Sequence, residues 1–472
     1  MKLCAKFSIL LFLTLLQRLP AQENSQGDER LPKGPRFASE ALNASTASGS
    51  FSEMTHYPQT EPRPLEFRTA IELAVRNSAT TSVAQADQER ARAAIAQATN
   101  LYVPSMTVGA ALGYSHGFPL SLEGAAPSLF NVNLGGLLFN PAQKDYIRAA
   151  RAEAATTSQQ NADRRNDVIT ETALDYMQLD LLESSLSIQN QQRDAAARLQ
   201  EIVGQRVQAG VDSQVELTRA KLSVARTRLD IAQARTAADQ LRLRLSQLTG
   251  LPLSAIRTST ESIPKLPEVS QTDDLAAQAA QNNASVKTAE QAAEAKKFRA
   301  EAERKQLYPE VNLAGQYALL ARYNNYDQFF KTFERNNLTI GGTIRFNFLN
   351  QSQRAAAEAA RFDAIKARKE AQAVKEQVSA DTLKLQRSVE QLSAAREVAD
   401  LEHQLALADI DAAHAKIDSG NATIKDEQDA RISEHQRYTA YLNSTFELDK
   451  AQVQLLRQTG DLEKWALGTP SH

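Results

Sequence analysis

The sequence predicts a mixed α/β fold made of two internal repeats, each with two short strands and a pair of very long helices. Three features predict it: landmarks that recur at a steady offset, segments of alternating polarity, and helical tracts without proline. Pro104, Gly135 and Gly250 are matched, 205 to 210 residues later, by Pro309, Gly341 and Gly460. Such an offset indicates an internal duplication. We place the repeats at residues 65–250 and 272–467, with a linker at residues 251–271.

The N-terminus has the features of a secretory signal peptide over residues 1–21. Lys2 and Lys6 flank the start of a ten-residue apolar stretch, and Ala21 offers a small residue for cleavage. Ten residues are too few to cross about 30 Å of hydrocarbon as a helix, which disfavours a membrane anchor. Residues 22–64 are rich in Ser, Gly and Pro without a period, so we expect a flexible leader.

Composition excludes several classes of function. A formal net charge of −2 gives no basic field that would attract nucleic acid. The only cysteine, Cys4, lies in the predicted signal peptide, so the mature chain has no disulfide or thiolate metal site. No phosphate loop, metal motif or activated nucleophile is found, and we expect neither an enzyme nor a cofactor. His403 and His414 could share a helix face, but two histidines without further ligands do not indicate a metal site.

Four segments alternate between apolar and polar residues with the period of two that is typical of strands. They are residues 105–115, 128–138, 310–319 and 337–348. Their length of near ten residues suits a tilted strand that crosses a bilayer, although a soluble sheet packed on helices would show the same alternation. Two matched hairpins behind a signal peptide favour membrane-spanning strands over a soluble sheet. Known barrels start at eight strands, so several chains must pool their strands, and three chains would supply twelve.

Very long helices are predicted after each pair of strands. Between Pro141 and Val207 the chain has no further proline and only one glycine, and a helix of this length would span about 100 Å. Each long helix is followed by a glycine-containing turn and a return helix. The sequence therefore predicts helical hairpins at residues 141–248 and 352–465.

The return helix of the first hairpin carries two heptad seams. One seam contains Leu217, Val224, Ile231, Ala238 and Leu245. The other contains Leu222, Ala225, Leu229, Ala232, Thr236 and Leu243. A helix with two seams packs against two neighbours, as in a wall of helices. An ordinary coiled-coil rod would also carry heptads, but it would not explain the strands that the same chain contains.

Together these features resemble the TolC-like outer-membrane efflux family over residues 65–467. Residues 65–74 resemble the opening segment of that family, and residues 206–216 and 420–430 resemble the turns of its two long hairpins. Each motif alone is weak, whereas the ordered set across both repeats is specific.

The resemblance implies a homotrimer with a twelve-stranded membrane β-barrel, four strands per chain, continued by a long α-helical coiled-coil barrel in the periplasm. The implied partners are a periplasmic adaptor (membrane fusion) protein, an inner-membrane transporter and the lipid of the outer membrane. The implied function is the channel of a tripartite efflux or type I secretion system, which passes small molecules or proteins. Drug efflux, metal export and protein secretion stay open, because the partner pump usually selects the substrate. The alternative is a periplasmic coiled-coil scaffold or adaptor without a pore.

The resemblance also implies a constriction, the periplasmic aperture, at the hairpin tips. Asp426 and Asp429 stand six and nine positions after Gly420, where the family carries two aspartates that ring the closed aperture. Their spacing places both on one helical face, and six carboxylates around a threefold axis would bind cations. Glu216 falls where the first turn often carries an aspartate. By composition alone, these residues would be solvated helix acids.

The turns are expected to contact the adaptor, through Arg206 and Gly210 in the first hairpin and Gly420 in the second. The sequence departs from the family beside the second turn. Ile417 and Ala422 stand where its best-known members carry the tyrosine and the arginine that lock the closed aperture. The departure leaves open how this aperture is held closed.

Overall fold

The computed structural model describes most of the chain after the predicted leader. The described residues are 64–110, 128–269, 274–320, 334, 336–347, 349–419, 421–422 and 424–468. The predictions of a signal peptide and of a flexible leader up to residue 63 lie outside them. Among the described helices, none combines the length and the apolar character that a membrane crossing requires.

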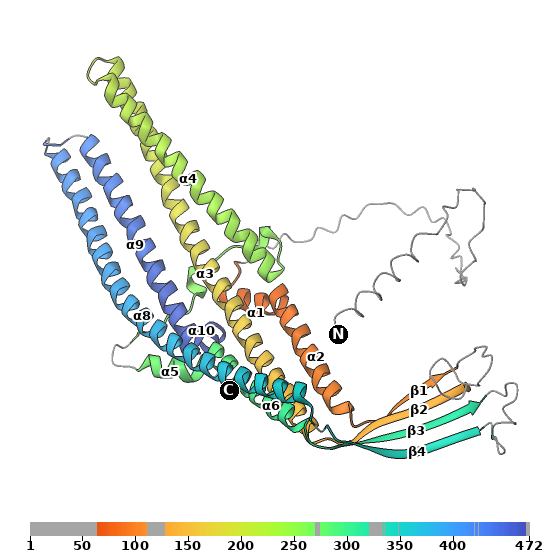
Figure 1. Cartoon of the computed structure of the whole chain (residues 1–472). Helices are drawn as coiled ribbons and strands as arrows, with labels where there is room; N and C mark the ends of the chain where they lie inside the picture. The colour runs from red at the N-terminus through yellow and green to blue at the C-terminus, as the bar shows by residue number, and fades with distance from the viewer. Residues whose placement is uncertain are drawn as a thin grey trace, which may run out of the picture. The chain divides into compact units, whose positions relative to one another are not determined.

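Four strands form one antiparallel sheet in chain order, as Figure 1 shows. They are β1 (Ser105–Gly109), β2 (Ser128–Phe139), β3 (Glu310–Leu320) and β4 (Asn336–Arg345). Each repeat supplies one hairpin, and β2 joins the two hairpins by pairing with β3. β1 and β4 are therefore the two edges of the sheet. The fold class predicted from the alternation, four strands beside long helices, is confirmed.

Two strands end earlier than predicted, whereas the other limits agree with the prediction to within one residue. β1 ends at Gly109, Ala110 after it is not in a strand, and the rest of the predicted strand, from residue 111, lies outside the described residues. β4 ends at Arg345 instead of residue 348, and its partner strand explains why. Arg345 pairs with Glu310, the first residue of β3, and Pro309 before it has no backbone N–H with which to extend the ladder.

The long helices have the same lengths in both repeats. α3 (Pro141–Gln208) and α8 (Gln351–Asp418) have 68 residues each, and α4 (Gln214–Thr249) and α9 (Ile424–Thr459) have 36 each. The two 68-residue helices begin at an asparagine cap. The side-chain oxygen of Asn140 accepts from the Ala142 N–H at 2.8 Å, and that of Asn350 accepts from the Gln353 N–H at 3.0 Å. Equal lengths and like caps agree with an internal duplication.

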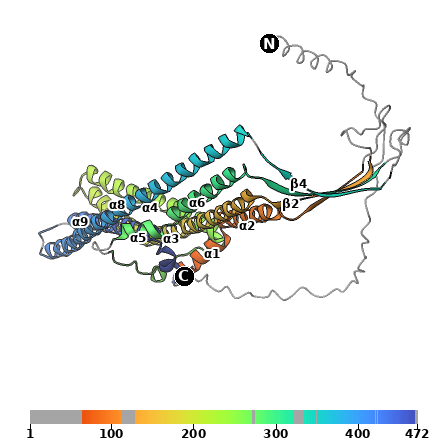
Figure 2. The same ribbon diagram turned by 60° about the horizontal axis from the view of Figure 1, so that its bottom comes forward.

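Two shorter helices complete the wall next to the sheet. α2 (Ala79–Asn100) and α6 (Ala284–Lys305) flank α3, and α8 packs against the far side of α6. The order α2, α3, α6, α8 thus repeats the order of the four strands. At the ends of α3 and α8 remote from the sheet lie α4 and α9, as both views show (Figure 1, Figure 2). The hairpin tips are therefore far from the strands along the chain and in space.

A compact core lies where the hairpins meet the shorter segments. Its small helices are α1 (Phe67–Asn77) and α10 (Leu462–Leu467), with two 3-10 turns at Leu253–Ala255 and Thr260–Ser262. A third small helix, α5 (Leu275–Asn282), packs beside this core on α8 and α9. The Phe67 ring is 5.4 Å from both the Tyr176 ring and the Trp465 ring in edge-on contact. The Tyr176 hydroxyl donates to the Leu65 carbonyl and accepts from the Ser259 N–H at 2.8 Å. This core ties both ends of the described chain to α3.

The first heptad seam of α4 is confirmed. Val224, Ile231, Ala238 and Leu245 are buried, together with Ala220 and Leu241 of the same face. This face packs on α3. The second seam is not covered within the chain, because Leu222, Leu229 and Leu243 are exposed.

Candidate functional site at the hairpin tips

The turn of the first hairpin is closed by a glycine and an ion pair. Gly210 has φ of 75°, a left-handed conformation that glycine adopts without strain. The chain therefore folds back, and the Val211 N–H donates to the Arg206 carbonyl at 2.9 Å. The Arg206 guanidinium then donates to both carboxylate oxygens of Asp212, at 2.8 and 3.2 Å, and this contact lowers the pKa of Asp212. Arg206 thus stabilises the turn that the sequence predicts as a contact for another protein.

Glu216 lies in the first turn of α4. The Ser213 hydroxyl caps this helix by accepting from the Glu216 N–H at 3.3 Å. The Glu216 carboxylate accepts from the Arg219 guanidinium at 2.6 Å, the i, i+3 partner on the same face. An acid at this position also interacts favourably with the positive end of the helix dipole.

The second hairpin places its acids on the first two turns of α9. Asp426 and Asp429 are both exposed, whereas Glu427 between them is partly buried. The Glu427 carboxylate is 2.9 Å from Nε of Arg431 and 3.4 Å from Nε2 of His414 on α8. Glu427 therefore links the two helices of the hairpin and leaves the flanking aspartates on the surface. The predicted turn residue Gly420 lies outside the described residues.

A cleft of about 540 Å³ lies between the two tips, and several of the predicted residues line it. Arg206 and Glu216 line it from the first hairpin, and Asp429 lines it from the second. Asp426 and Gly210 are not among its lining residues. The remaining wall is largely apolar and includes both positions that depart from the family: Leu199, Ile202, Val203, Ala220, Ile417, Ala422 and Ile432.

The partner of Glu216, and the pair that Glu427 forms between the predicted aspartates, were missed at the level of sequence. Arg219 and Arg431 stand three and four positions after Glu216 and Glu427, a spacing that could have identified both pairs. The histidines are explained by packing between helices. Nε2 of His403 is 3.0 Å from the Glu434 carboxylate, so His403 and His414 each contact a glutamate of α9.

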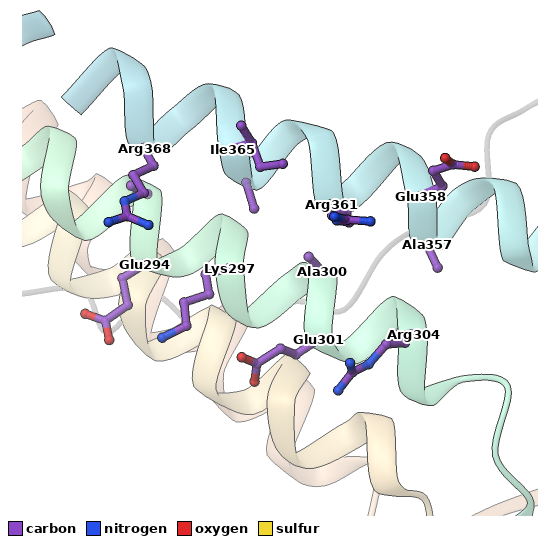
Figure 3. A pocket seen from close by; sticks show the side chains of 12 residues that line it. Glu294, Lys297, Ala300, Glu301, Arg304, Ala357, Glu358, Arg361, Ile365 and Arg368 are labelled. Atoms are coloured by element: carbon purple, nitrogen blue, oxygen red, sulfur yellow. The ribbon is translucent and has the colours of Figure 1, made fainter. Parts of the chain in front are cut away.

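Further cavities lie outside the tip cleft, and two of them adjoin long helices of the hairpins. One of about 490 Å³ lies between α3, α4 and α9, where burial lowers the pKa of His435. The other, of about 940 Å³, lies between α6 and α8 and contains none of the predicted site residues (Figure 3). In the described part of the chain, no three His, Cys, Asp or Glu side chains gather as metal ligands would.

Comparison with known proteins agrees with this arrangement. Residues 70–251 match the family model described as outer membrane efflux protein. The CmeC outer membrane channel of Campylobacter jejuni superposes with a TM-score of 0.70 at 15% identity, over 84% of this chain and 86% of that chain. This is the fold of the TolC-like outer-membrane efflux proteins. The resemblance seen in the sequence is thereby confirmed.

Two more solved structures share the TolC-like fold. The outer membrane protein VceC of Vibrio cholerae has a TM-score of 0.65 at 19% identity, over 83% of this chain and 96% of its own. The open state of the Neisseria gonorrhoeae MtrE outer membrane channel has a TM-score of 0.65 at 17% identity, over 84% and 90%. No match was found among curated proteins. The prediction that the chain is not an enzyme agrees with the family match.

Proposed function

We propose that the chain forms a homotrimeric outer-membrane channel, with its helical part in the periplasm, in a tripartite efflux or type I secretion system. The observation that carries this proposal is the open sheet. Every residue of β4 is exposed, and its apolar side chains are uncovered, with Leu338 68% exposed and Ile340 69%. β1 and β4 each pair on one side only. A single sheet with such open edges is not stable in the hydrocarbon core of a membrane, because each unpaired backbone N–H or C=O group would cost several kcal/mol there.

Three copies would satisfy these edges. If β4 of one chain pairs with β1 of the next, three chains make a closed ring of twelve strands without an edge. The apolar face of the strands would then contact lipid. A soluble scaffold without a pore offers no cover for this face, so the sheet favours the channel over the alternative.

The helices support the same assembly. The uncovered second seam of α4 includes Leu229, which is 56% exposed. On α8, Val398, Leu401 and Leu405 form another uncovered apolar stripe, with Leu401 57% exposed. Leu229 stands fifteen residues after the start of α4 at Gln214, and Leu401 seventeen before the end of α8 at Asp418. At these similar distances from the tips, α4 of one copy would pack on α8 of the next.

The tips would form the periplasmic aperture and the contact with the adaptor. A threefold axis through the tips would gather the exposed Asp426 and Asp429 of three chains, and Glu216 beside them, into an acidic constriction that admits cations. Val211 and Val215 of the first hairpin are exposed apolar side chains beside Gly210. They would give a periplasmic adaptor linked to an inner-membrane transporter an apolar contact, with Arg206 held in place behind it.

Fractionation and mass measurement test the proposal. We expect the protein in the outer-membrane fraction, soluble only with detergent, with the mass of three chains and with ion conductance in planar bilayers. Recovery of a monomer that needs no detergent would contradict the proposal and favour the scaffold. The chain with Leu338→Glu and Ile340→Glu serves as a control, because charged residues on the lipid-facing side should prevent insertion.

A further inference from the structure

The cleft of about 940 Å³ between α6 and α8 has a floor of small side chains (Figure 3). The floor consists of Ala293 and Ala300 from α6 and Ala357 and Ala364 from α8. The distance between two packed helices depends on the side chains at their contact, so alanines let these two backbones approach closely. The cleft is the space between these alanines and the longer side chains on either side.

The two walls of the cleft carry long, mostly charged side chains in regular order. From α6 they are Glu294, Lys297, Glu301 and Arg304; from α8 they are Glu358, Arg361, Ile365 and Arg368. On both helices the spacing is three, four and three residues, which keeps each set on one helical face. Each wall is therefore a single line of side chains along the cleft, and all of them except Ile365 are charged.

The lines are complementary across the cleft because the helices run in opposite directions. Gln353 fixes their register near the sheet, where its side-chain amide donates to the Glu303 carboxylate at 2.9 Å. Figure 3 then shows opposite charges at three of four levels: Glu294 with Arg368, Glu301 with Arg361, and Arg304 with Glu358. Only the level of Lys297 and Ile365 has a single charge.

These complementary charges do not meet. Within the described residues, none of the six has an ion-pair partner within 4.0 Å. Figure 3 shows the side chains of Glu301 and Arg304 leaning away from α8. Opposite charges at three of the four levels would attract one another if rotamers changed and the helices moved slightly together. Along this cleft, which we call the α6–α8 seam, oppositely charged side chains therefore lie at matching levels without forming ion pairs.

We propose that α6 and α8 close this seam by forming three ion pairs, Glu294–Arg368, Glu301–Arg361 and Arg304–Glu358. One exposed pair shifts an equilibrium by about two- to fivefold, so three in a ladder shift it by about ten- to a hundredfold. The closure is a property of the single chain. Its role in the channel, to tighten the tunnel wall next to the barrel, rests on the proposed function.

A cysteine pair at the uncharged level reports the width of the seam. Lys297→Cys and Ile365→Cys face each other across the cleft, and Cys4→Ser removes the only native thiol. In the full-length protein in detergent, a short bismaleimide should cross-link the pair rapidly at low salt. Raising the ionic strength to about 1 M should slow the cross-link about tenfold or more, because salt screens exposed ion pairs. A rate independent of salt would overturn the proposal.

Charge reversal in the reporter background tests the pairs themselves. Glu301→Arg should slow the cross-link, because it sets two arginines against each other, and adding Arg361→Glu should restore the rate. The matched control is Glu290→Arg, the same change at an exposed position of α6 outside the cleft. The proposed ion pairs would be contradicted if Glu301→Arg and Glu290→Arg slowed the cross-link equally, or if the double reversal did not restore its rate. Oligomeric state measured on the same samples separates this result from failure of the proposed trimer.

Discussion

The core around α1 and the surfaces at the sheet and the tips are opposite in kind. Around Phe67, aromatic and aliphatic side chains from α1, α3, α4, α9 and α10 are fully covered by their own chain. On β4 and on the outer faces of α4 and α8, apolar side chains of similar size are left open. One chain thus covers the apolar side chains of its core by itself, whereas the apolar side chains of the sheet and of the outer helix faces would be covered only by further copies of the chain.

The largest expected effect lies in the core. Phe67→Ala removes a fully buried ring that contacts Tyr176 and Trp465, and we expect it to lower the free energy of unfolding by about 3–5 kcal/mol. Phe362→Ala on α8, where the ring is 59% exposed, should leave the unfolding of the monomer nearly unchanged. Chemical denaturation of both variants checks this, and equal losses would remove the distinction between core and open surface.

The core also contains a charge that should make stability depend on pH. Burial raises the pKa of Asp175 to about 6, and its contact with Arg244 at 3.3 Å does not compensate fully. Because the folded pKa lies above the unfolded one, stability should fall as pH rises from about 4 to about 6, by up to ~3 kcal/mol. Asp175→Asn should abolish this contribution.

Unfolding curves of Asp175→Asn and wild type across that range give the measurement. Asp239→Asn, at a position 74% exposed on α4, is the matched control and should follow wild type. A constant difference between Asp175→Asn and wild type at all pH values would argue against the raised pKa.

On the open surface, the expected effect is on assembly. Leu229→Glu places a charge on the uncovered seam of α4, and we expect it to weaken the trimer by about 2–3 kcal/mol for each contact. Unfolding of the monomer should change by less than about 0.5 kcal/mol. Sedimentation in detergent measures assembly, with Arg228→Glu as the neighbouring exposed control. A stable Leu229→Glu trimer would show that α4 does not meet another copy.

The smallest effect is expected at the tips, where solvent screens the charges. Asp429→Ala should raise conductance or weaken block by divalent cations by about fivefold. One exposed charge interaction contributes about 1 kcal/mol, and this energy corresponds to a factor of about five. Asp426→Ala should have a smaller effect, because only Asp429 lines the cleft between the tips. Planar-bilayer recordings of the two variants test whether Asp429→Ala has the larger effect. Unchanged conductance in both would count against an acidic aperture.

Much of the fold followed from periodicity. The strands followed from a period of two, and the buried face of α4 followed from heptads that contain Val224 and Ile231. The second seam indicated another neighbour, which the single chain does not supply. These features depend on local patterns that one sequence displays in full.

Features that join distant positions could not be predicted in the same way. The pair of Arg206 and Asp212 requires the left-handed turn at Gly210, which brings the two side chains together. The tip cleft unites Glu216 with Asp429, and its existence depends on how two separate hairpins pack. The register of α6 against α8 likewise depends on β3 pairing with β4, which fixes where both helices begin and end.

The contact of Phe67 with Trp465 has a consequence for biosynthesis. The two residues are 398 positions apart, yet their rings lie 5.4 Å from each other in the same core. A chain made from its N-terminus cannot complete this core until Trp465 has emerged, and contacts of such sequence separation form slowly. A truncated chain would keep apolar surface exposed and be prone to aggregation and proteolysis. Only chains that include Trp465 can therefore reach the folded state from which an assembly begins.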